Sequence, residues 1–270
     1  MSSEFSDLVR PPLREKDLER SLLRRGDTWS SLRVVADIGS TNAELVRAAR
    51  AGAASGAVLV AEHQHAGRGR LDRSWTAPVR SGLTFSVLLR PRAVPVSAWG
   101  WFPLLAGVAV ARATAEVAEL EVLLKWPNDV LVGDRKLAGI LAERVDDALV
   151  LGVGLNVSSR ADELPVEGAT SLHLEGAVSI DRAPVLLALL RELADRYEAF
   201  EATGGDPVAS GVHPAYLRLC ATLGRQVRVA LPGGGEVAGP AMDVDEAGRL
   251  VVATDSGEVR VAAGDVVHVR

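Results

Sequence analysis

The chain has 270 residues, of which 48% are hydrophobic and 24% are charged, so it can bury a sizeable core and lacks the composition of a disordered protein. Its formal net charge of −5 argues against a nucleic-acid partner, because proteins that bind DNA or RNA gain most of their affinity from a basic surplus. The single cysteine, Cys220, cannot form an internal disulfide, which predicts an intracellular protein.

No segment has the length and hydrophobicity expected of a membrane span. The first 20 residues, MSSEFSDLVRPPLREKDLER, lack the apolar core of a signal peptide. The longest apolar stretch, residues 98–111, has 14 residues and contains Pro103, whereas a membrane helix needs about 20. The sequence therefore predicts a cytoplasmic protein with no membrane contact.

The chain begins with a polar lead-in, residues 1–30, for which we expect loose order and one short helix. Residues 32–38 have the pattern of a strand. Thr41, with Glu44 three residues later, fits a capping box, which predicts a helix over residues 42–50.

The central part of the chain alternates between strand and helix patterns, interrupted by an aperiodic loop at residues 66–75. Strands are predicted at residues 57–62, 83–89, 122–126, 130–132, 136–144 and 148–157. Helices are predicted at residues 97–119 and 184–203.

From residue 223 onward, short valine-rich strands are separated by Gly-rich or Asp-rich turns every 8 to 12 residues. This spacing is typical of a small β-barrel. We place a boundary near Ala221, which divides the chain into a lead-in (1–30), a central domain (31–220) and a C-terminal β-domain (221–270).

Residues 63–70, with the sequence HQHAGRGR, form the first candidate functional segment. Glycines let a backbone approach a phosphate closely, and arginines pair with it, but no Lys-Ser/Thr follows as in a Walker loop. A solvated, flexible loop is an equal alternative, and the acidic chain disfavours an RNA-binding tract. His63 and His65 lack partners with metal-ligand spacing.

Lys125, within the strand-like run VLLKW, is the second candidate. Its amine either extends into solvent at a sheet edge or is held inward by a ligand anion, and position alone favours the first. Asn128 and Asp129 can be explained as turn residues.

The third candidate is GVGLNV, residues 152–157. Two glycines within a strand imply the close approach of backbone or of a ligand, and close packing against a helix explains them equally well. Asn156 needs polar partners in this apolar setting, which an adenine edge would supply.

The segments GSTN, AEHQHAGRGR, SW, KWPNDVLV, RKLAGILAE and GVGLNV occur in this order along the chain. In order and approximate spacing they resemble the corresponding segments of biotin protein ligases. The resemblance covers residues 31–220, and the C-terminal β-domain belongs to the same pattern.

The resemblance implies an α+β fold: a mixed sheet flanked by helices, related to class II aminoacyl-tRNA synthetases, with a C-terminal SH3-like β-barrel. It implies a reaction in which the carboxylate of biotin attacks the α-phosphate of ATP, giving biotinyl-5′-AMP and pyrophosphate. A lysine of the biotin carboxyl carrier domain of a carboxylase then attacks the mixed anhydride. Because no enzyme nucleophile is needed, the lack of a Ser-His-Asp or Cys-His pattern is expected.

The resemblance also implies roles for individual residues. Lys125 would contact both the biotin carboxylate and the α-phosphate. Arg68 and Arg70, with Gly69 between them, would hold the acyl-phosphate region. Four polar residues are expected around the ureido ring of biotin: Ser40, Thr41, Asn42 and Gln64.

The nucleotide side is implied in less detail. Trp75 and Asn156 are expected to contact adenine, and Lys136 either assists the phosphates or is a surface lysine. Mg²⁺ is expected on the nucleotide phosphates. Its protein ligands are unassigned, with Asp129 as a candidate.

About 30 residues precede the predicted catalytic domain, too few for the winged helix-turn-helix of bifunctional family members. We therefore expect no transcriptional role and a monomeric apo protein. A lipoate ligase and a non-catalytic biotin-dependent regulator are the alternatives; GSTN, HQH and the C-terminal domain favour biotin over lipoate, and Lys125 with the loop arginines favours an enzyme. The composition of residues 68–73 predicts a loop that is disordered until ligand binds.

Overall fold

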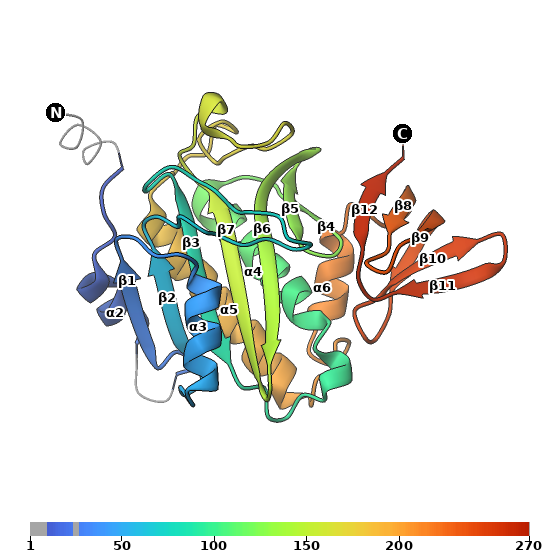
Figure 1. Ribbon diagram of the computed structural model, residues 1–270, viewed down its shortest axis with the longest axis horizontal. Helices are drawn as coiled ribbons and strands as arrows, with labels where there is room; N and C mark the ends of the chain where they lie inside the picture. Colours follow the sequence, from blue (N-terminus) through green and yellow to red (C-terminus); the bar gives the residue numbers. More distant parts are fainter. Residues whose placement is uncertain (1–9, 24–26, 270) are drawn as a thin grey trace.

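The computed structural model describes residues 10–23 and 27–269. A seven-stranded sheet forms the centre of the molecule, in the order β1-β2-β3-β7-β6-β5-β4. Strands β1 (Ser31–Val35) and β2 (Ala57–Ala61) are parallel, and the remaining pairs of this sheet are antiparallel (Figure 1). The predicted mixed sheet is confirmed.

The other elements lie close to their predicted ranges. The remaining strands of the large sheet are β3 (Gly82–Leu89), β4 (Leu123–Lys125), β5 (Asp129–Val132), β6 (Arg135–Val145) and β7 (Ala148–Asn156). The helices are α2 (Glu15–Leu22), α3 (Thr41–Arg50), α4 (Trp101–Ala118), α5 (Arg182–Ala202) and α6 (Val212–Leu219), with 3-10 turns at Val96–Ala98 and Ala161–Glu163. Helix α6 was not predicted; Pro214 lies in its first turn, where proline is tolerated but obscures a helical pattern.

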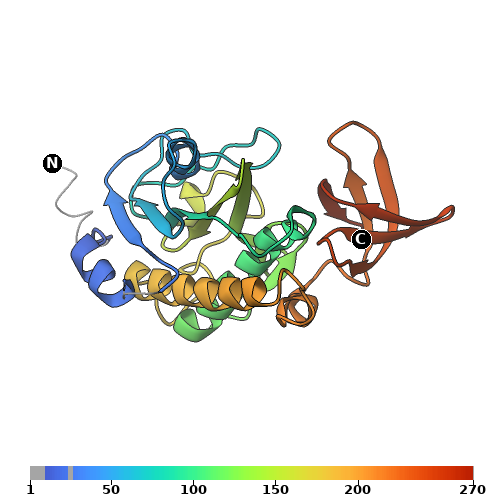
Figure 2. The ribbon, with the colours of Figure 1, turned by 90° about the horizontal axis from the view of Figure 1, so that it is seen from below.

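Helices cover both faces of the large sheet. Helix α3 connects the parallel strands β1 and β2 and packs against β3, β6 and β7. Helices α4 and α5 pack together on the opposite face (Figure 2). Helix α4 is long and apolar enough to cross a membrane, but 72% of it is buried inside this domain. Its hydrophobicity is thus explained by the core that it helps to form.

The predicted capping box at the start of α3 is wrong by one residue. Ser40 is the N-cap, and its hydroxyl accepts a hydrogen bond from the backbone N–H of Ala43 at 3.4 Å. Glu44 pairs with Arg47 on the exposed side of the helix. Thr41, expected to be the cap, is instead buried, and its hydroxyl takes part in the contacts of the cavity described below.

The described part of the lead-in contains the one short helix that was expected, α2, and packs against the central domain. Leu18 and Leu22 of α2 are buried in the main core. Upstream of α2, the backbone N–H of Leu13 donates to Glu62 Oε1 at 2.6 Å. Glu62 also pairs with Arg182 of α5 at 2.5 Å, and both side chains are 6% exposed. The prediction of loose order also covers residues 1–9 and 24–26, which lie outside the described residues.

The C-terminal part forms a separate five-stranded antiparallel sheet, as expected for an SH3-like β-barrel. Its strands, in the order β11-β10-β9-β8-β12, are β8 (Gln226–Ala230), β9 (Glu236–Val244), β10 (Leu250–Thr254), β11 (Gly257–Val261) and β12 (Asp265–His268). Two buried tryptophans fix this domain to the central one: Trp101 Nε1 donates to the carbonyl of Glu246 at 2.9 Å, and Trp126 Nε1 to that of Gly248 at 3.0 Å.

Candidate active site

A cavity of about 640 Å³ opens beside the large sheet. It is lined by the start of α3, the loop at residues 68–76, strands β3 to β7 and the first residues of β12. The cavity collects every residue that the resemblance singled out: Ser40, Thr41, Asn42, Gln64, Arg68, Gly69, Arg70, Trp75, Lys125, Asp129, Lys136 and Asn156. These residues come from segments that are far apart in the sequence.

One end of the cavity has a buried chain of hydrogen bonds. Gln64 Oε1 accepts from the backbone N–H of Thr41 at 2.7 Å and from its hydroxyl at 3.0 Å. The Thr41 hydroxyl lies 2.7 Å from the Ser86 hydroxyl, which donates to Asn42 Oδ1 at 2.5 Å. These contacts hold Thr41, Asn42 and Gln64 in fixed orientations at the wall of the cavity, with Ser86 behind them.

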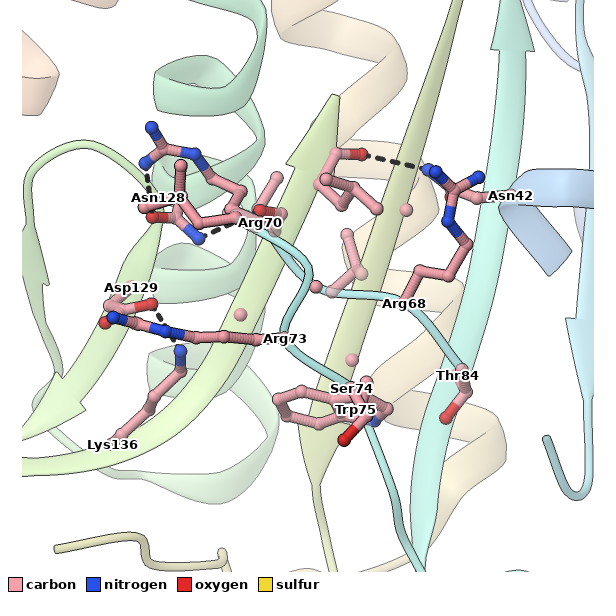
Figure 3. Close-up of a pocket in the computed structure, with 18 of the residues that line it drawn as sticks. Asn42, Arg68, Arg70, Arg73, Ser74, Trp75, Thr84, Asn128, Asp129 and Lys136 are labelled. Atoms are coloured by element: carbon pink, nitrogen blue, oxygen red, sulfur yellow. Dashed lines mark hydrogen bonds and ion pairs between the residues drawn. The ribbon is translucent and has the colours of Figure 1, made fainter. Parts of the chain in front are cut away.

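Glu143 of β6 extends this chain toward the arginine loop. Its Oε2 accepts from Asn42 Nδ2 at 2.9 Å, and its Oε1 lies 3.1 Å from Arg68 Nη1. Arg68 and Arg70 point in different directions from the loop, toward Asn42 and Asn128 respectively (Figure 3). The polar end of the cavity and Arg68 therefore share one carboxylate.

The two glycines of β7 make room for side chains from other elements. A Cβ on Gly152 would lie 2.1 Å from Asn42 Oδ1, and one on Gly154 would lie 2.2 Å from the Trp75 ring. Gly154 is paired with Gly139 of β6, and neither residue has a side chain. The Trp75 ring therefore packs directly on the backbone of the sheet at these two positions. The explanation by packing against a helix holds for Gly152, whose neighbour Asn42 belongs to α3, whereas Gly154 makes room for Trp75 of the loop. Both neighbours line the cavity.

Gly152→Ala should lower the free energy of unfolding by about 1–3 kcal/mol, because the added methyl overlaps Asn42 in a packed region. Chemical denaturation measures this change. Gly233→Ala is the matched control, since a Cβ there meets nothing within 4 Å, and it should stay within about 0.5 kcal/mol of the parent. Equal stability of the two variants would contradict the assigned contact.

The opposite end of the cavity is cationic. Arg70 Nη1 donates to Asn128 Oδ1 at 2.9 Å, and Asn128 is fixed by its own hydrogen bond to the carbonyl of Ile140 at 3.0 Å. Lys136 Nζ lies 2.6 Å from Asp129 Oδ1, so Lys136 belongs to the cavity wall (Figure 3). Five cationic and three acidic residues line the cavity, a local positive surplus in an acidic chain.

Lys125 differs from the other cations of the cavity. Arg68, Arg70, Arg73 and Lys136 each contact a carboxylate or an amide oxygen of the protein. Within the described part of the chain, Lys125 has no such partner although it lines the same cavity. A half-buried ammonium group without a protein anion is suited to pair with an anionic ligand.

Burial and neighbouring charges shift the pKa values of two groups, Arg70 and His268. The pKa of Arg70 is lowered by burial, against the opposing effect of Asp129 and Asp265. The pKa of His268 in β12 is lowered by burial and by the charges of Lys125 and Arg225. The neutral form of His268 is therefore favoured, and it adds no positive charge beside Lys125.

Two residues expected on the nucleotide side, Asn156 and Asp129, have partners within the protein. Asn156 is buried and its amide donates to the carbonyl of Thr170 at 2.9 Å. Asp129, the candidate Mg²⁺ ligand, is engaged by Lys136. Within residues 10–23 and 27–269, no group of three or more His, Cys, Asp or Glu side chains is arranged to hold a metal ion.

Sequence reasoning missed Ser86, Glu143 and Asp265. Ser86 carried a usable signal, because it is a polar residue inside the apolar run of β3 and is fully buried. Glu143 and Asp265 carried none, since an acidic residue in a strand is usually solvated.

Comparison with known proteins relates this arrangement to a defined family. The sequence profile of the Biotin/lipoate A/B protein ligase family matches residues 38–158, and that of the biotin protein ligase C-terminal domain matches residues 222–269. The biotin–[acetyl-CoA-carboxylase] ligase of Mycobacterium tuberculosis is 46% identical over 268 residues, covering 98% of both chains. The chain belongs to the biotin protein ligase family.

Other members of the biotin protein ligase family are similar over much of the chain. The bifunctional ligase/repressor of Escherichia coli (strain K12) is 34% identical over 80% of this chain and 67% of its own length. The structure of the Aquifex aeolicus biotin protein ligase in complex with biotin and ATP matches with a TM-score of 0.74 and 29% identity, over 90% of this chain and 100% of that one. The biotin protein ligase fold expected from the sequence is confirmed.

Proposed function

We propose that this chain uses ATP to activate biotin and then joins it to a lysine of an acceptor protein. The observation that supports this most directly is Lys125, which has no anionic partner among the described residues and lines a cavity with a polar end and a cationic end. Biotin has matching ends, since it carries a ureido ring and a carboxylate at opposite ends of the molecule. The similarity to an enzyme whose structure contains biotin and ATP points to the same ligands.

In the first step, a carboxylate oxygen of biotin attacks the α-phosphorus of ATP. A carbon–oxygen–phosphorus linkage forms, the bond between the α-phosphorus and the bridging oxygen breaks, and pyrophosphate leaves. Carboxylate and triphosphate repel each other, so fixed positive charge where they meet lowers the barrier. Lys125 would bind both anions, and Arg68 and Arg70 would hold the phosphate against the acyl group.

The polar end of the cavity would orient biotin for this attack. The proposed ligands of the ureido ring are Ser40, Thr41, Asn42 and Gln64, with Gly69 giving the loop close access to the phosphate. The hydrogen bonds among these side chains keep them in place before the ligand arrives. Pre-organised groups bind with less loss of conformational entropy.

In the second step, the neutral amine of the acceptor lysine attacks the acyl carbon and AMP leaves. We propose the biotin carboxyl carrier domain of a carboxylase as the acceptor, which agrees with the name of the Mycobacterium tuberculosis relative. No nucleophile of the enzyme enters either step. A monomeric apo protein and a cytoplasmic location stay predictions.

Mg²⁺ is proposed to arrive on the nucleotide rather than at a site built from protein carboxylates. The described residues hold no cluster that fits such a site, and Asp129 is neutralised by Lys136. Mg²⁺ keeps several water ligands and commonly binds through substrate phosphates. When bound there it would offset phosphate charge.

The wild-type protein should release pyrophosphate from ATP only when biotin is present, and should label a carboxylase carrier domain. A coupled pyrophosphate assay with biotin, lipoate or octanoate measures the first step. If lipoate or octanoate replaced biotin, the ligase chemistry would hold and the substrate assignment would fail. If none of the three acids supported release by folded protein, the proposed activity would be wrong.

A further inference from the structure

The third arginine of the loop, Arg73, reaches across to the C-terminal domain. Both of its terminal nitrogens contact Asp265 at the start of β12: Nη1 donates to Oδ1 at 3.3 Å, and Nη2 pairs with Oδ2. Hydrogen bonding to Asp265 raises the pKa of Arg73. The loop of the central domain is thus attached to a carboxylate nearly two hundred residues further along the chain.

Arg73 also closes the loop into a hairpin. Its carbonyl accepts from the backbone N–H of Gly69 at 2.7 Å, and its own N–H donates to the carbonyl of Arg70 at 3.1 Å. Arg68 and Arg70 lie on the other arm of this hairpin. The position of Arg73 therefore contributes to where the backbone of those two arginines lies over the cavity, together with the contacts of Arg68 with Glu143 and of Arg70 with Asn128.

The local sequence does not favour this hairpin. Its tip, Leu71 and Asp72, has φ angles of 52° and 58°, a left-handed conformation that residues with a Cβ avoid. Turns with two such residues normally use Asn-Gly or Gly-Gly. Contacts outside the loop help to hold it. On the arm beyond the tip, Trp75 packs over Gly154 of the large sheet, and Arg73 pairs with Asp265 of the C-terminal domain.

Asp265 is a firm anchor because its domain is firmly docked. Trp101 and Trp126 are buried and donate hydrogen bonds to the turn before β10, and the bond from Trp126 is itself buried. A Cβ on Gly100 would lie 2.3 Å from the carbonyl of Ala247, so this turn lies directly against the start of α4. The neighbours of Asp265 in the chain, Gly264 and Val266, line the cavity itself.

We propose that Asp265 is a positioning residue, which holds Arg73 and so keeps the Arg68–Arg70 arm of the hairpin over the cavity. This inference rests on the proposed function, since it assigns the C-terminal domain a part in binding the substrates of the first step. Asp265 acts through Arg73 and touches no reacting atom. Its loss lowers the fraction of molecules in which the loop is placed to bind.

The first test measures the loop itself, without substrates. In Asp265→Asn, amide hydrogen exchange at Gly69 and Arg73 should be about threefold to fivefold faster, the size expected for loss of a half-exposed ion pair. Asp255→Asn changes an exposed acidic residue in the turn between β10 and β11, for which no contact with the loop is found among the described residues, and it should leave both amides unchanged. Unchanged exchange in Asp265→Asn would overturn the proposal.

The second test measures the reaction. Asp265→Asn should raise the KM for biotin about threefold to fivefold and change kcat by less than about twofold, because only the competent fraction falls. Asp265→Arg should raise the KM for biotin further than Asp265→Asn does. Adding Arg73→Glu to Asp265→Arg should lower this KM again in part, because the double variant restores an ion pair. A fall in kcat at constant KM, or no recovery in the double variant, would overturn the proposal. Absence of biotin-dependent release in the wild type would instead overturn the proposed function, and the exchange test would still stand.

Discussion

Lys125→Ala should reduce biotin-dependent pyrophosphate release by about 100-fold to 1000-fold, the usual effect of removing one group that stabilises developing charge. Within the described part of the chain, Lys125 is the cation of the cavity that contacts neither a carboxylate nor an amide oxygen of the protein. It would meet both the carboxylate and the α-phosphate, so its removal restores the repulsion between them. Initial rates at saturating ATP and biotin measure the loss.

The chain offers a matched control. Lys16→Ala removes an exposed lysine from α2 and should leave the rate unchanged. Lys125→Arg should recover little activity, because a planar guanidinium does not place its charge where the compact ammonium does. If Lys125→Ala retained more than about a tenth of the wild-type rate while folded, the assigned role would be wrong.

Glu62→Ala should lower the free energy of unfolding by about 3–5 kcal/mol, because it leaves the buried guanidinium of Arg182 without its partner. The same carboxylate accepts the backbone N–H of Leu13, and Arg182 also donates to the carbonyl of Pro11 at 2.6 Å. The substitution therefore releases the lead-in as well as the start of α5. A chain of this size should lose roughly 10 °C in melting temperature, which calorimetry measures.

Two further variants separate burial from charge. Glu44→Ala breaks the exposed pair with Arg47 and should cost less than about 1 kcal/mol. Combining Glu62→Gln with Arg182→Met removes both charges and should recover much of the stability that Glu62→Ala loses. If Glu62→Ala lowered the free energy of unfolding no more than Glu44→Ala does, the buried pair of Glu62 and Arg182 would be unimportant for the fold.

Local sequence patterns predicted most of the helices and strands, and the resemblance to biotin protein ligases named most of the cavity residues. Strand alternation and helical spacing are local patterns, so they placed β3, β6, β7, α4 and α5 within a few residues of their observed bounds. Glycine and lysine in apolar runs marked Gly152, Gly154 and Lys125 as exceptions that need an explanation. These are properties of short segments, which a sequence displays directly.

The tertiary structure alone decided how each exception is resolved. Whether Gly152 faces a ligand or a side chain depends on Asn42, which is more than one hundred residues away in the sequence. The partners of the three loop arginines are Glu143, Asn128 and Asp265, whose residue types would suit any solvated surface. Only the folded structure shows that these arginines have protein partners, whereas Lys125 is left to bind a ligand. Charge pairing is a matter of distance in space. Sequence patterns report only the neighbours within a segment, and the partners of Arg68, Arg73 and Glu62 come from elements that only the folded chain brings together.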